Sequence, residues 1–544
     1  MRHYGNGCWN NNFMKKELEI IIKEAVLGLF KIEQVDFAVE HPAVEKFGDY
    51  TTNAAMVLAK ILKKKPMEIA ESLKLGFRNL KKPSFEDAFE KIEAVEPGHI
   101  NFYLSQKYLQ NKIAEINEQK ENFGNSETGK GEKIHLDFVS ANPTGPVTLG
   151  NGRGGTLGDA LANVLGKTGH KVWREYYVND FGNQIKVLGH SILKDSEAQY
   201  KGDYIDELSK RVSGTDPFEV GQGAAKIILE EIVKPSMKKI GIAFDEYFSE
   251  KSLHNSGAVE KVFEEFLEKD FLYEKDGAVW FRAEKFGDEK DRVVRKSTGE
   301  VTYFGGDIAY HRNKFERGFS RAIDVWGADH HGDVKRVMGA VEALGYGGKL
   351  TIIINQLLKV IKDGKEFRMS KRKGTYVSID DLLEEAGKDA VRFFFLMYSN
   401  DTHMTFDLDL AKERSEKNPV FYVQYAHARI CSIIRKAKEA NYELETMNYE
   451  NLDLLKNEKE LGLIRELNKF PELVEEISES YEVHKLPHYA IKLADKFHSF
   501  YNACRVIDAE KPKLSKARLN LINAVRIVLA ETLRLMGVNA PEKM

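Results

Sequence analysis

Apolar residues near the start of the chain recur at helical spacing. After residue 13, the positions that repeat every three or four residues are Leu18, Ile21, Ile22, Ala25 and Leu29. Such spacing is typical of an amphipathic helix. Residues 51–63 predict a second helix, and residues 89–95 and 100–104 predict short strands. The polar, glycine-rich stretch 122–132 is typical of a linker, so the pattern predicts a small α+β domain over residues 14–118.

Beyond residue 132 the pattern changes to β-runs that alternate with helices. Residues 134–139 form a β-run, a Pro/Gly loop follows, and helical spacing extends over about 152–168 before the next β-run at 172–178. Strand, helix and strand in this order predict parallel strands of one sheet. Apolar β-runs return at 322–326 and 350–355.

Residues 185–275 have a mostly helical pattern, and residues 278–281 and 291–303 predict β strands. We interpret about 190–300, which separates the two groups of β-runs, as an insertion. The β-runs predict a Rossmann-type α/β domain with a parallel sheet over residues 119–412. Long helical patterns dominate residues 413–544 and predict an α-helical bundle. We therefore expect a multidomain α/β protein. Its 544 residues agree with this, because one hydrophobic core stops growing at roughly 250–300 residues.

Composition and charge narrow the class of protein. The chain is 42% hydrophobic and 30% charged, as folded domains are. A net charge of −3 excludes a uniformly basic surface but is compatible with a local basic groove for RNA. Three scattered cysteines give neither a disulfide framework nor a zinc site. The chain lacks an apolar run of about 18–20 residues and a secretory signal. We therefore expect a cytoplasmic protein, and residues 1–13 are expected to be a disordered extension.

The sharpest motif stands between the first β-run of the sheet and the helix that follows it. Residues 140–154 read SANPTGPVTLGNGRG. Glycines let a ligand approach the backbone, and a helix N-terminus offers free N–H groups and a positive dipole end to phosphate. A glycine-rich segment of this kind is often only a turn, so the motif alone does not decide between the two.

A second motif, much later in the chain, reads FRMSKRKGT at residues 367–375. By itself a basic run usually forms a solvated surface. A phosphate cradle followed at a distance by a lysine loop, however, resembles the class I aminoacyl-tRNA synthetases. The two motifs of that class read His-x-Gly-His and Lys-Met-Ser-Lys-Ser.

Further motifs resemble one family of that class. They are SANPTGP at 140–146, EYYVND at 175–180, DGAVWF at 276–281, GADHHG at 327–332 and LMGVNAPEKM at 535–544. In these motifs and their order, almost the whole chain after residue 13 is similar to bacterial-type arginyl-tRNA synthetases. Thr148 and Asn151 depart from the family, which has histidines there, and Arg368 replaces a lysine. Thr and Asn side chains still donate hydrogen bonds, although they cannot become cations as imidazole can.

The resemblance implies an arginine–tRNA ligase that works in two steps. L-arginine and ATP with Mg²⁺ would give arginyl-adenylate and pyrophosphate, and the arginyl group would then pass to the 3′-terminal adenosine of tRNA(Arg). It also implies that the domain at 14–118 contacts tRNA, that residues 413–544 bind the anticodon, and that tRNA must be bound before arginine is activated. No protein-bound structural metal, DNA partner or membrane is expected, and the protein is expected to be a monomer.

The matching motif positions give the expected ATP site. Its residues are Thr148, Gly150, Asn151, Gly152, Met369, Ser370 and Lys371. We assign catalysis to Thr148, Asn151 and Lys371, with Lys371 stabilising the negative charge of the transition state.

Arginine is expected to meet Tyr303 and Asp307, which are four apart and so face the same way on a helical turn. The planar guanidinium fork pairs best with a carboxylate. A solvated Asp at a helix start is the alternative. The resemblance adds the arginine-binding positions Asp137, Ser140, Ala141, Asn142, Asn151 and Asp329. His330 and His331 do not predict a metal site, because neighbours on a strand point to opposite faces and no third ligand is evident.

The predicted first helix of the C-terminal bundle carries the expected tRNA contacts Tyr422, Tyr425 and Arg429. Aromatic side chains there could stack on splayed anticodon bases. Phe421, Tyr425 and Ala428 equally fit a plain helix-packing stripe, and the sequence does not separate the two interpretations.

Three other functions remain open. A cysteinyl-type synthetase would need zinc-binding cysteines, and a nucleotidyltransferase would explain neither the lysine motif nor the helical C-terminal region. A non-catalytic RNA-binding relative would explain the missing histidines. It would not explain why Tyr303, Asp307 and Lys371 occur together in one chain.

Overall fold

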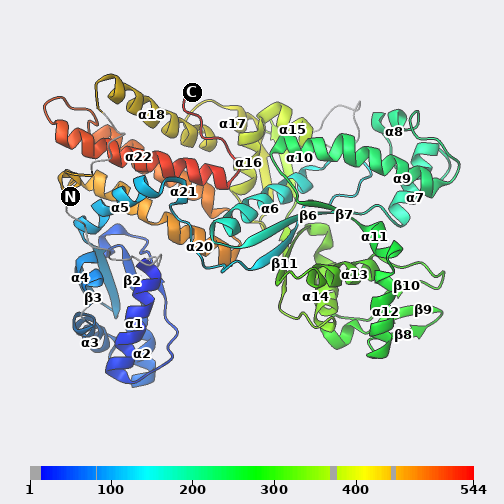
Figure 1. Ribbon diagram of the computed structural model, residues 1–544, viewed down its shortest axis with the longest axis horizontal. Coiled ribbons are helices and arrows are strands. Elements are labelled where there is room, and N and C mark those ends of the chain that lie inside the picture. Colours follow the sequence, from blue (N-terminus) through cyan, green and yellow to red (C-terminus); the bar gives the residue numbers. More distant parts are fainter. Residues whose placement is uncertain (1–13, 81, 368–376, 443–448) are drawn as a thin grey trace.

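The computed structural model describes residues 14–80, 82–367, 377–442 and 449–544. The expected extension and most of the lysine motif lie outside these ranges. Figure 1 shows an N-terminal domain at the lower left, an α/β part at the centre and right, and a helical bundle at the upper left. No described helix combines the length and the apolar character needed to cross a bilayer.

The N-terminal domain packs its helices against one antiparallel sheet. The helices are α1 (Met14–Phe30), α2 (Ala54–Leu62), α3 (Pro66–Asn79) and α4 (Pro83–Ala88). The strands, in the order β1-β2-β4-β3, are β1 (Val39–Glu40), β2 (Tyr50–Thr52), β4 (His99–Leu104) and β3 (Phe89–Val95). A buried aromatic cluster of Phe77, Phe85, Phe89 and Phe102 joins α3 and α4 to the sheet. The helices and strands of an α+β domain are therefore present.

A five-stranded parallel sheet with the order β12-β11-β5-β6-β7 forms the centre of the α/β part. Its strands are β5 (Lys133–Asp137), β6 (Lys171–Val178), β7 (Glu246–Ser249), β11 (Arg321–Gly327) and β12 (Leu350–Asn355). Helix α6 (Leu149–Lys167) follows β5 and packs on β5, β6, β11 and β12. Strand β7 lies within the range that we expected to form an insertion, so part of that range belongs to the central sheet.

Two groups of elements flank the sheet on the right of Figure 1. The upper group contains α7 (Asn183–Leu193), α8 (Asp203–Leu208), α9 (Pro217–Ile228) and α10 (Lys234–Ile240). The lower group contains α11 (Glu250–Asn255), α12 (Ala258–Glu268), β8 (Leu272–Lys275), β9 (Ala278–Phe281), β10 (Arg292–Arg295), α13 (Tyr303–Glu316), η5 (Ala328–Asp333) and α14 (Val334–Ala343).

After β12 the chain passes into the helical bundle. The connecting elements are β13 (Leu358–Lys362), β14 (Lys365–Glu366), α15 (Ile379–Ala386), α16 (Lys388–Leu396), β15 (Met404–Asp407) and α17 (Leu408–Lys412). The long helices of the bundle are α18 (Pro419–Glu439), α19 (Glu458–Asn468), α20 (Phe470–Ser480), α21 (Lys485–Ala503) and α22 (Pro512–Leu535).

Helix α5 (Gln106–Gln119) leaves the N-terminal domain and packs against α19 and α22 of the bundle. Gln110 Nε2 donates to the carbonyl of Leu455 at 3.0 Å, and Asn117 Nδ2 donates to the carbonyl of Asn520 at 3.0 Å. The last helix of the segment expected to form the N-terminal domain is therefore also part of the packing of the C-terminal bundle.

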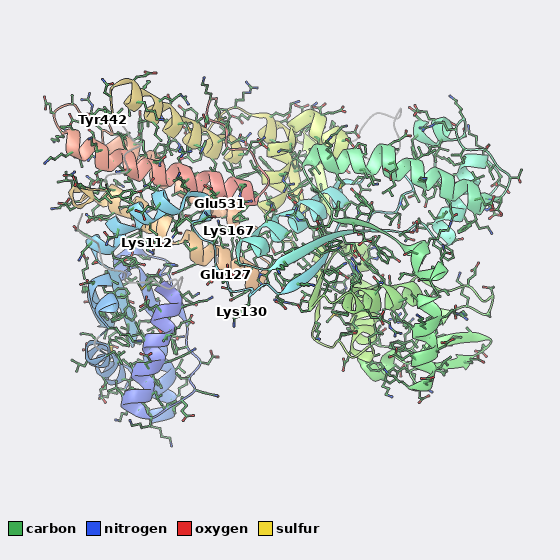
Figure 2. All side chains as sticks on the ribbon, in the orientation of Figure 1. Lys112, Glu127, Lys130, Lys167, Tyr442 and Glu531 are labelled. Atoms are coloured by element: carbon green, nitrogen blue, oxygen red, sulfur yellow. The ribbon has the colours of Figure 1, made fainter. Side chains whose placement is uncertain are left out.

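A buried ion pair joins the far end of α6 to the last helix of the bundle (Figure 2). Lys167 Nζ lies 2.8 Å from Glu531 Oε1, and the two side chains are 1% and 4% exposed. Lys167 also donates to the Glu121 carbonyl and to Asn125 Oδ1, both at 2.9 Å. The C-terminal end of α6 is thus bound to the bundle and to the linker.

Arg392 of α16 forms a second buried joint between the α/β part and the bundle. Its guanidinium donates to Asp159 Oδ2 at 2.5 Å, to the Met536 carbonyl at 2.7 Å and to the Ile240 carbonyl at 3.1 Å. The side chain is 0% exposed. One arginine therefore connects α6, α10, α16 and the end of α22.

Replacing Arg392 by Met removes a cation from Asp159 and leaves two buried carbonyls without their donor, although Arg174 still contacts Asp159 at 2.8 Å. We expect the free energy of unfolding to fall by about 3 kcal/mol, because one-sided removal of a buried pair leaves an uncompensated charge. Thermal unfolding followed by circular dichroism measures this. Arg211→Met, which breaks an exposed pair with Glu231, is the control and should leave Tm unchanged. An unchanged Tm in Arg392→Met would contradict the expectation.

Candidate active site

The loop between β5 and α6, residues 138–148, is called the phosphate loop below. It is held by a hydrogen-bonded pair, Thr148 and Asn151. Thr148 is the N-cap of α6, and its Oγ1 accepts from the backbone N–H of Asn151 at 3.2 Å and donates to Asn151 Oδ1 at 2.5 Å. Asn151 Nδ2 donates to the carbonyl of Val139 at 3.2 Å. A Cβ added to Gly152 would lie 2.6 Å from Ile379 Cδ1, so glycine lets the neighbouring segment pack here. The structure thus brings together the residues that replace the two histidines.

The loop between β5 and α6 begins with two residues in strained conformations. Val139 (φ 71°) and Ser140 (φ 35°) both have positive φ. A β-branched residue there is an outlier, and such strain is found where surrounding contacts enforce it, often at functional sites. Ser140 Oγ donates to Asp137 Oδ1 at 2.5 Å and accepts from the backbone N–H of Tyr177 at 3.0 Å. These two bonds fix the turn that brings the phosphate loop to the carboxyl edge of the sheet.

The chain that leaves the lysine motif returns to the phosphate loop. Ser378 forms an antiparallel bridge with Thr148, and the backbone N–H of Ile379 donates to the carbonyl of Val147 at 2.9 Å. Ser378 also begins α15 with a capping box, in which its backbone N–H and hydroxyl both bind Asp381 Oδ2. The expected residues Met369, Ser370 and Lys371, and also Arg368, lie outside the described residues. The next described segment, which begins at residue 377, is bound to the phosphate loop through Ser378 and Ile379.

Tyr303 and Asp307 occupy the first turns of α13, after the N-cap Thr302. Burial raises the pKa of Asp307 to about 6, and His311 opposes this effect. Within the part of the chain that the structure describes, no Lys, Arg or His nitrogen lies within 4.0 Å of the Asp307 carboxylate. The Tyr303 side chain is 45% exposed at the same helix end. This end of α13 therefore offers a partly buried carboxylate that is free to pair with a cation.

A second carboxylate, Glu250 of α11, lies close to Asp307. Glu250 is 5% exposed, burial raises its pKa, and its Oε2 has no hydrogen-bond partner among the described atoms. A Cβ on Gly306 would lie 3.1 Å from Glu250 Oε1, so glycine allows the carboxylate to approach α13. Glu250 was not among the residues predicted from the sequence. It belongs to no motif, and the only available signal was its place directly after a short β-run, since ligands of parallel sheets bind at the carboxyl ends of strands.

Asp137 at the end of β5 is already surrounded by partners. It is 5% exposed and accepts hydrogen bonds from Ser140 Oγ, from Tyr310 Oη at 3.1 Å and from Lys314 Nζ at 3.4 Å. Burial raises its pKa, and the Lys314 ammonium opposes this effect. The carboxylate thus lies beneath the loop as part of a buried network.

The other expected arginine contacts differ in their surroundings. The Ala141 carbonyl accepts from Tyr176 Oη at 2.8 Å, and Asn142 Oδ1 accepts from Asn179 Nδ2 at 3.0 Å, so both hold the loop on β6 and its end. Asp329 lies in η5 with a side chain that is 81% exposed, 3.7 Å from His330. The described residues contain no group of three or more His, Cys, Asp or Glu side chains arranged to hold a metal ion.

The expected tRNA contacts lie along α18. Tyr422 Oη donates to Asp495 at 2.8 Å and so binds α18 to α21. Tyr425 is 39% exposed and stacks on Phe421 with ring centroids 6.2 Å apart. The Arg429 guanidinium lies over the rings of Tyr425 and Tyr501 at 5.5 and 4.5 Å. Tyr425 is thus exposed and the partly buried Arg429 packs on its ring, whereas the partly buried Tyr422 links α18 to α21.

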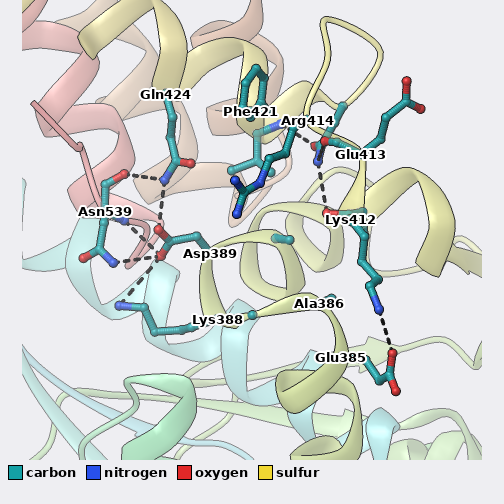
Figure 3. Close-up of a pocket in the computed structure, with 15 residues that line it drawn as sticks. Glu385, Ala386, Lys388, Asp389, Lys412, Glu413, Arg414, Phe421, Gln424 and Asn539 are labelled. Atoms are coloured by element: carbon teal, nitrogen blue, oxygen red, sulfur yellow. Dashed lines mark hydrogen bonds and ion pairs between the residues drawn. The ribbon is translucent and has the colours of Figure 1, made fainter. Parts of the chain in front are cut away.

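A cavity of about 470 Å³ lies away from the phosphate loop, between α15–α17 and α18 (Figure 3). The Asp389 carboxylate at its wall is bound by Gln424 at 2.9 Å and by Asn539 at 3.2 Å, and Lys412 pairs with Glu385 at 2.8 Å. The charged groups named here are paired with one another or with amides. We therefore interpret this cavity as part of the packing interface between the α/β part and the bundle. A cavity of about 440 Å³ lies beside the phosphate loop and is lined by Pro143, Asp180, Gln222 and Lys251, among others.

These features define a class of enzyme. A parallel sheet, a glycine-rich loop at the N-terminus of α6 and a segment from Ser378, after the lysine motif, that is bound to this loop form the catalytic fold of class I aminoacyl-tRNA synthetases.

Family models divide the chain in agreement with this fold. The matches are "Arginyl tRNA synthetase N terminal domain" at residues 15–104, "tRNA synthetases class I (R), catalytic domain" at 112–210 and 222–430, and "DALR anticodon binding domain" at 423–544. The arginine–tRNA ligase of Carboxydothermus hydrogenoformans is 44% identical over 535 residues, which are 94% of this chain and 95% of that protein. The Bacillus subtilis enzyme is 43% identical and covers 98% of this chain and 99% of its own.

The fold is also that of the solved Thermus thermophilus arginyl-tRNA synthetase, with a TM-score of 0.77 at 22% identity over 98% of this chain and 100% of that one. The chain belongs to the arginyl-tRNA synthetase family. It is therefore an aminoacyl-tRNA ligase that uses ATP, with L-arginine and tRNA as partners. A cysteinyl-type synthetase, a nucleotidyltransferase and a non-catalytic RNA-binding protein are thereby set aside.

The Thr148–Asn151 pair predicts a measurable dependence of catalysis on Asn151. Asn151→Ala removes the amide that binds both Thr148 and the Val139 carbonyl. We expect kcat for tRNA charging to fall by about 10²-fold, because the expected role of the Asn151 amide is that of a preorganised donor to transition-state charge. Steady-state charging with labelled arginine measures this, with Asn255→Ala, at an exposed position, as the control. Full activity of Asn151→Ala would exclude the residue from catalysis.

Proposed function

We propose that the chain joins L-arginine to tRNA(Arg) at the carboxyl edge of the parallel sheet, and that Asp307 and Glu250 together bind the guanidinium. The observation that carries this assignment is the pair of neighbouring carboxylates, of which Glu250 is buried and Asp307 is partly buried. Two carboxylates match the several N–H donors of a guanidinium fork, and the permanent charge of arginine offsets their burial. Tyr303, at the same end of α13, completes the side of the pocket that faces solvent.

The same pair of carboxylates supports selection against lysine. A lysine ammonium is one compact charge and would leave carboxylate lone pairs without partners in a buried pocket. Sites built on specific hydrogen bonds reject analogues by about 10⁴-fold or more, so no editing step is needed.

ATP is proposed to bind at the N-terminus of α6, with its phosphates on Thr148, Gly150, Asn151 and Gly152. The uncapped N–H groups and the dipole of the helix favour negative charge there. We expect Mg²⁺ to arrive with ATP, because this ion usually binds substrate phosphates together with few protein ligands. Lys371 is proposed to stabilise the negative charge of the transferring phosphate. In support, the chain from Ser378, seven residues later in the sequence, is bound to this loop.

The proposed reaction has two balanced steps. The carboxylate of arginine attacks the α-phosphorus of ATP, so a new P–O bond forms and pyrophosphate leaves. A hydroxyl of the 3′-terminal ribose of tRNA then attacks the carbonyl of arginyl-adenylate, and AMP leaves. The first step depends on positioning and charge stabilisation more than on proton transfer. The phosphate loop, the two carboxylates and Lys371 supply these effects.

We further propose that residues 14–118 contact tRNA and that residues 413–544 read the anticodon, with Tyr425 and Arg429 at the surface that meets the bases. Exposed aromatic rings stack on unpaired bases, each contact worth about 1–3 kcal/mol. Tyr422 would hold the helix that carries them. A monomer in the cytoplasm is proposed as the working form. In support, the N-terminal domain and the bundle pack together within one chain, and Cys431 and Cys504 are free and buried.

Lys371→Ala tests the catalytic assignment. We expect tRNA charging with arginine to fall by more than about 10²-fold, because the cation that meets the transition-state charge is removed. The assay uses labelled arginine, with labelled lysine as the substrate control, and Lys365→Ala, on exposed β14, as the matched variant. If the wild-type protein bound tRNA but charged nothing, the proposed activity would be wrong. The next variants to test would then be Thr148→His and Asn151→His, which introduce the histidines of the family motif.

Asp307→Asn and Glu250→Gln test the guanidinium pocket without changing its volume. We expect each to raise KM for arginine by about 10²-fold, since a desolvated charge pair is lost, and to leave KM for ATP unchanged. In the wild type, Asp307 is protonated below its pKa of about 6, so kcat/KM for arginine should fall as pH is lowered through that value. Asp276→Asn, in an exposed turn, is the control. An unchanged KM for arginine in Asp307→Asn would exclude that residue from the pocket.

A further inference from the structure

His311 lies one helical turn after Asp307 on α13 and is 2% exposed. Its Nδ1 is 2.7 Å from the carbonyl oxygen of Asp307, and its Nε2 is 2.9 Å from Asp324 Oδ2. A carbonyl oxygen only accepts hydrogen bonds, and so does an ionised carboxylate. Both ring nitrogens therefore donate, which requires an imidazolium.

Asp324 is held in the ionised form that this geometry needs. Lys314 Nζ lies 2.8 Å from Asp324 Oδ1 and is itself 0% exposed. Burial opposes ionisation of Asp324, but Lys314 and His311 together hold its pKa well below the usual value. The Asp324 carboxylate is thus bound by a cation on each side.

The same lysine reaches the phosphate loop. Lys314 Nζ is 3.4 Å from Asp137 Oδ2, and Asp137 accepts the hydroxyl of Ser140 at the start of that loop. One continuous set of hydrogen bonds and ion pairs therefore connects the ATP side of the site, through Lys314 and Asp324, to the helix turn that carries Asp307.

We propose that His311 is a positioning residue for arginine: a buried imidazolium, fixed by Asp324, that stabilises the negative charge of Asp307 and holds its helix turn in place. The proposal rests on the proposed role of Asp307 in guanidinium binding. His311 binds the backbone of Asp307 and leaves the carboxylate free. The pocket therefore contains a positive charge that favours ionisation without competing with the substrate for the carboxylate oxygens.

Asp307 needs such a charge because most of its surroundings oppose ionisation. The charged and titratable groups that face it are His311 of its own helix, Glu250 of α11, Asp333 of η5, Arg336 of α14 and Tyr177 of β6. Burial, Glu250 and Asp333 raise its pKa, while His311, with the largest opposing effect, and Arg336 lower it. The groups that face His311 are Asp324 of β11, the ring of Tyr310 and the carbonyl of Asp307.

His311→Gln is the test, because glutamine keeps one donor but carries no charge. The measurement is the pH profile of kcat/KM for arginine in tRNA charging, which reports groups of the free enzyme. We expect the acid limb to move up by about one pH unit, as removal of a nearby opposite charge predicts. At pH 6 this lowers kcat/KM about fivefold relative to wild type, and the difference closes near pH 8.5. KM for ATP should not change.

The matched control is His190→Gln. His190 of α7 is 7% exposed and pairs at 2.8 Å with Asp195, which follows the helix. It therefore reproduces a His–Asp contact with a buried imidazole that involves none of the groups facing Asp307. Its acid limb should coincide with that of the wild type. A lower Tm or lower kcat in His311→Gln with an unmoved acid limb would mean that His311 only supports the fold, and would overturn the proposal.

Two further measurements separate the remaining outcomes. If His311→Gln does not fold, ring ¹⁵N spectra of the wild-type protein with labelled histidine decide the question. At pH 8 a doubly protonated ring that becomes neutral in Asp324→Asn supports the proposal, and its absence overturns it. If Asp307→Asn leaves KM for arginine unchanged, the proposed pocket is wrong. If instead Asp307→Asn raises that KM and His311→Gln does not move the acid limb, only this inference fails.

Discussion

The rest of the site depends on the two buried ion pairs that Lys314 forms with Asp137 and Asp324. Adjacent parallel strands β5 and β11 end in or near Asp137 and Asp324, and both carboxylates are buried in the interior of the α/β part. Two such charges could not share this space without a cation, since desolvation of an unpaired carboxylate costs several kcal/mol. Lys314 Nζ lies 3.4 Å from Asp137 and 2.8 Å from Asp324. With its charge in place, Asp137 can hold the strained start of the phosphate loop and Asp324 can hold His311.

Helix α6 carries this local order to the rest of the molecule. Its N-terminus forms the phosphate loop, and its C-terminus is bound through Lys167 to Glu531 of α22. Arg392 binds Asp159 near the middle of the same helix and the carbonyl of Met536 beyond α22. Because a helix is a rigid element, α6 fixes the position of the phosphate loop relative to the helices of the anticodon-binding region.

Much of the fold could be predicted from the sequence, because long periodic patterns report burial directly. The strands β5, β6, β11 and β12, helix α6 and the placement of Tyr303 and Asp307 on one helix end agree with the predictions. Strand β7 was not predicted, because four residues are too few to show a period. Glu250 was not predicted either, because it directly follows this strand and only the strand places it at the carboxyl edge of the sheet. The resemblance implies arginine binding for both Asp137 and Asp329, yet Asp137 is enclosed by partners and Asp329 is exposed. Motif position alone does not reveal this difference in solvation.

The packing of α5 has a consequence for how the chain is made. Asn117 of α5 donates to the carbonyl of Asn520, which follows 403 positions later, and the apolar face of α5 packs against helices made near the end of synthesis. A ribosome that adds about 5–20 residues per second needs on the order of 20–80 s to produce this partner. Throughout that interval α5 is without its packing surface while the α/β part forms behind it. The nascent chain therefore displays an unfinished hydrophobic surface near its beginning, where chaperones can bind, until the last helix emerges from the ribosome.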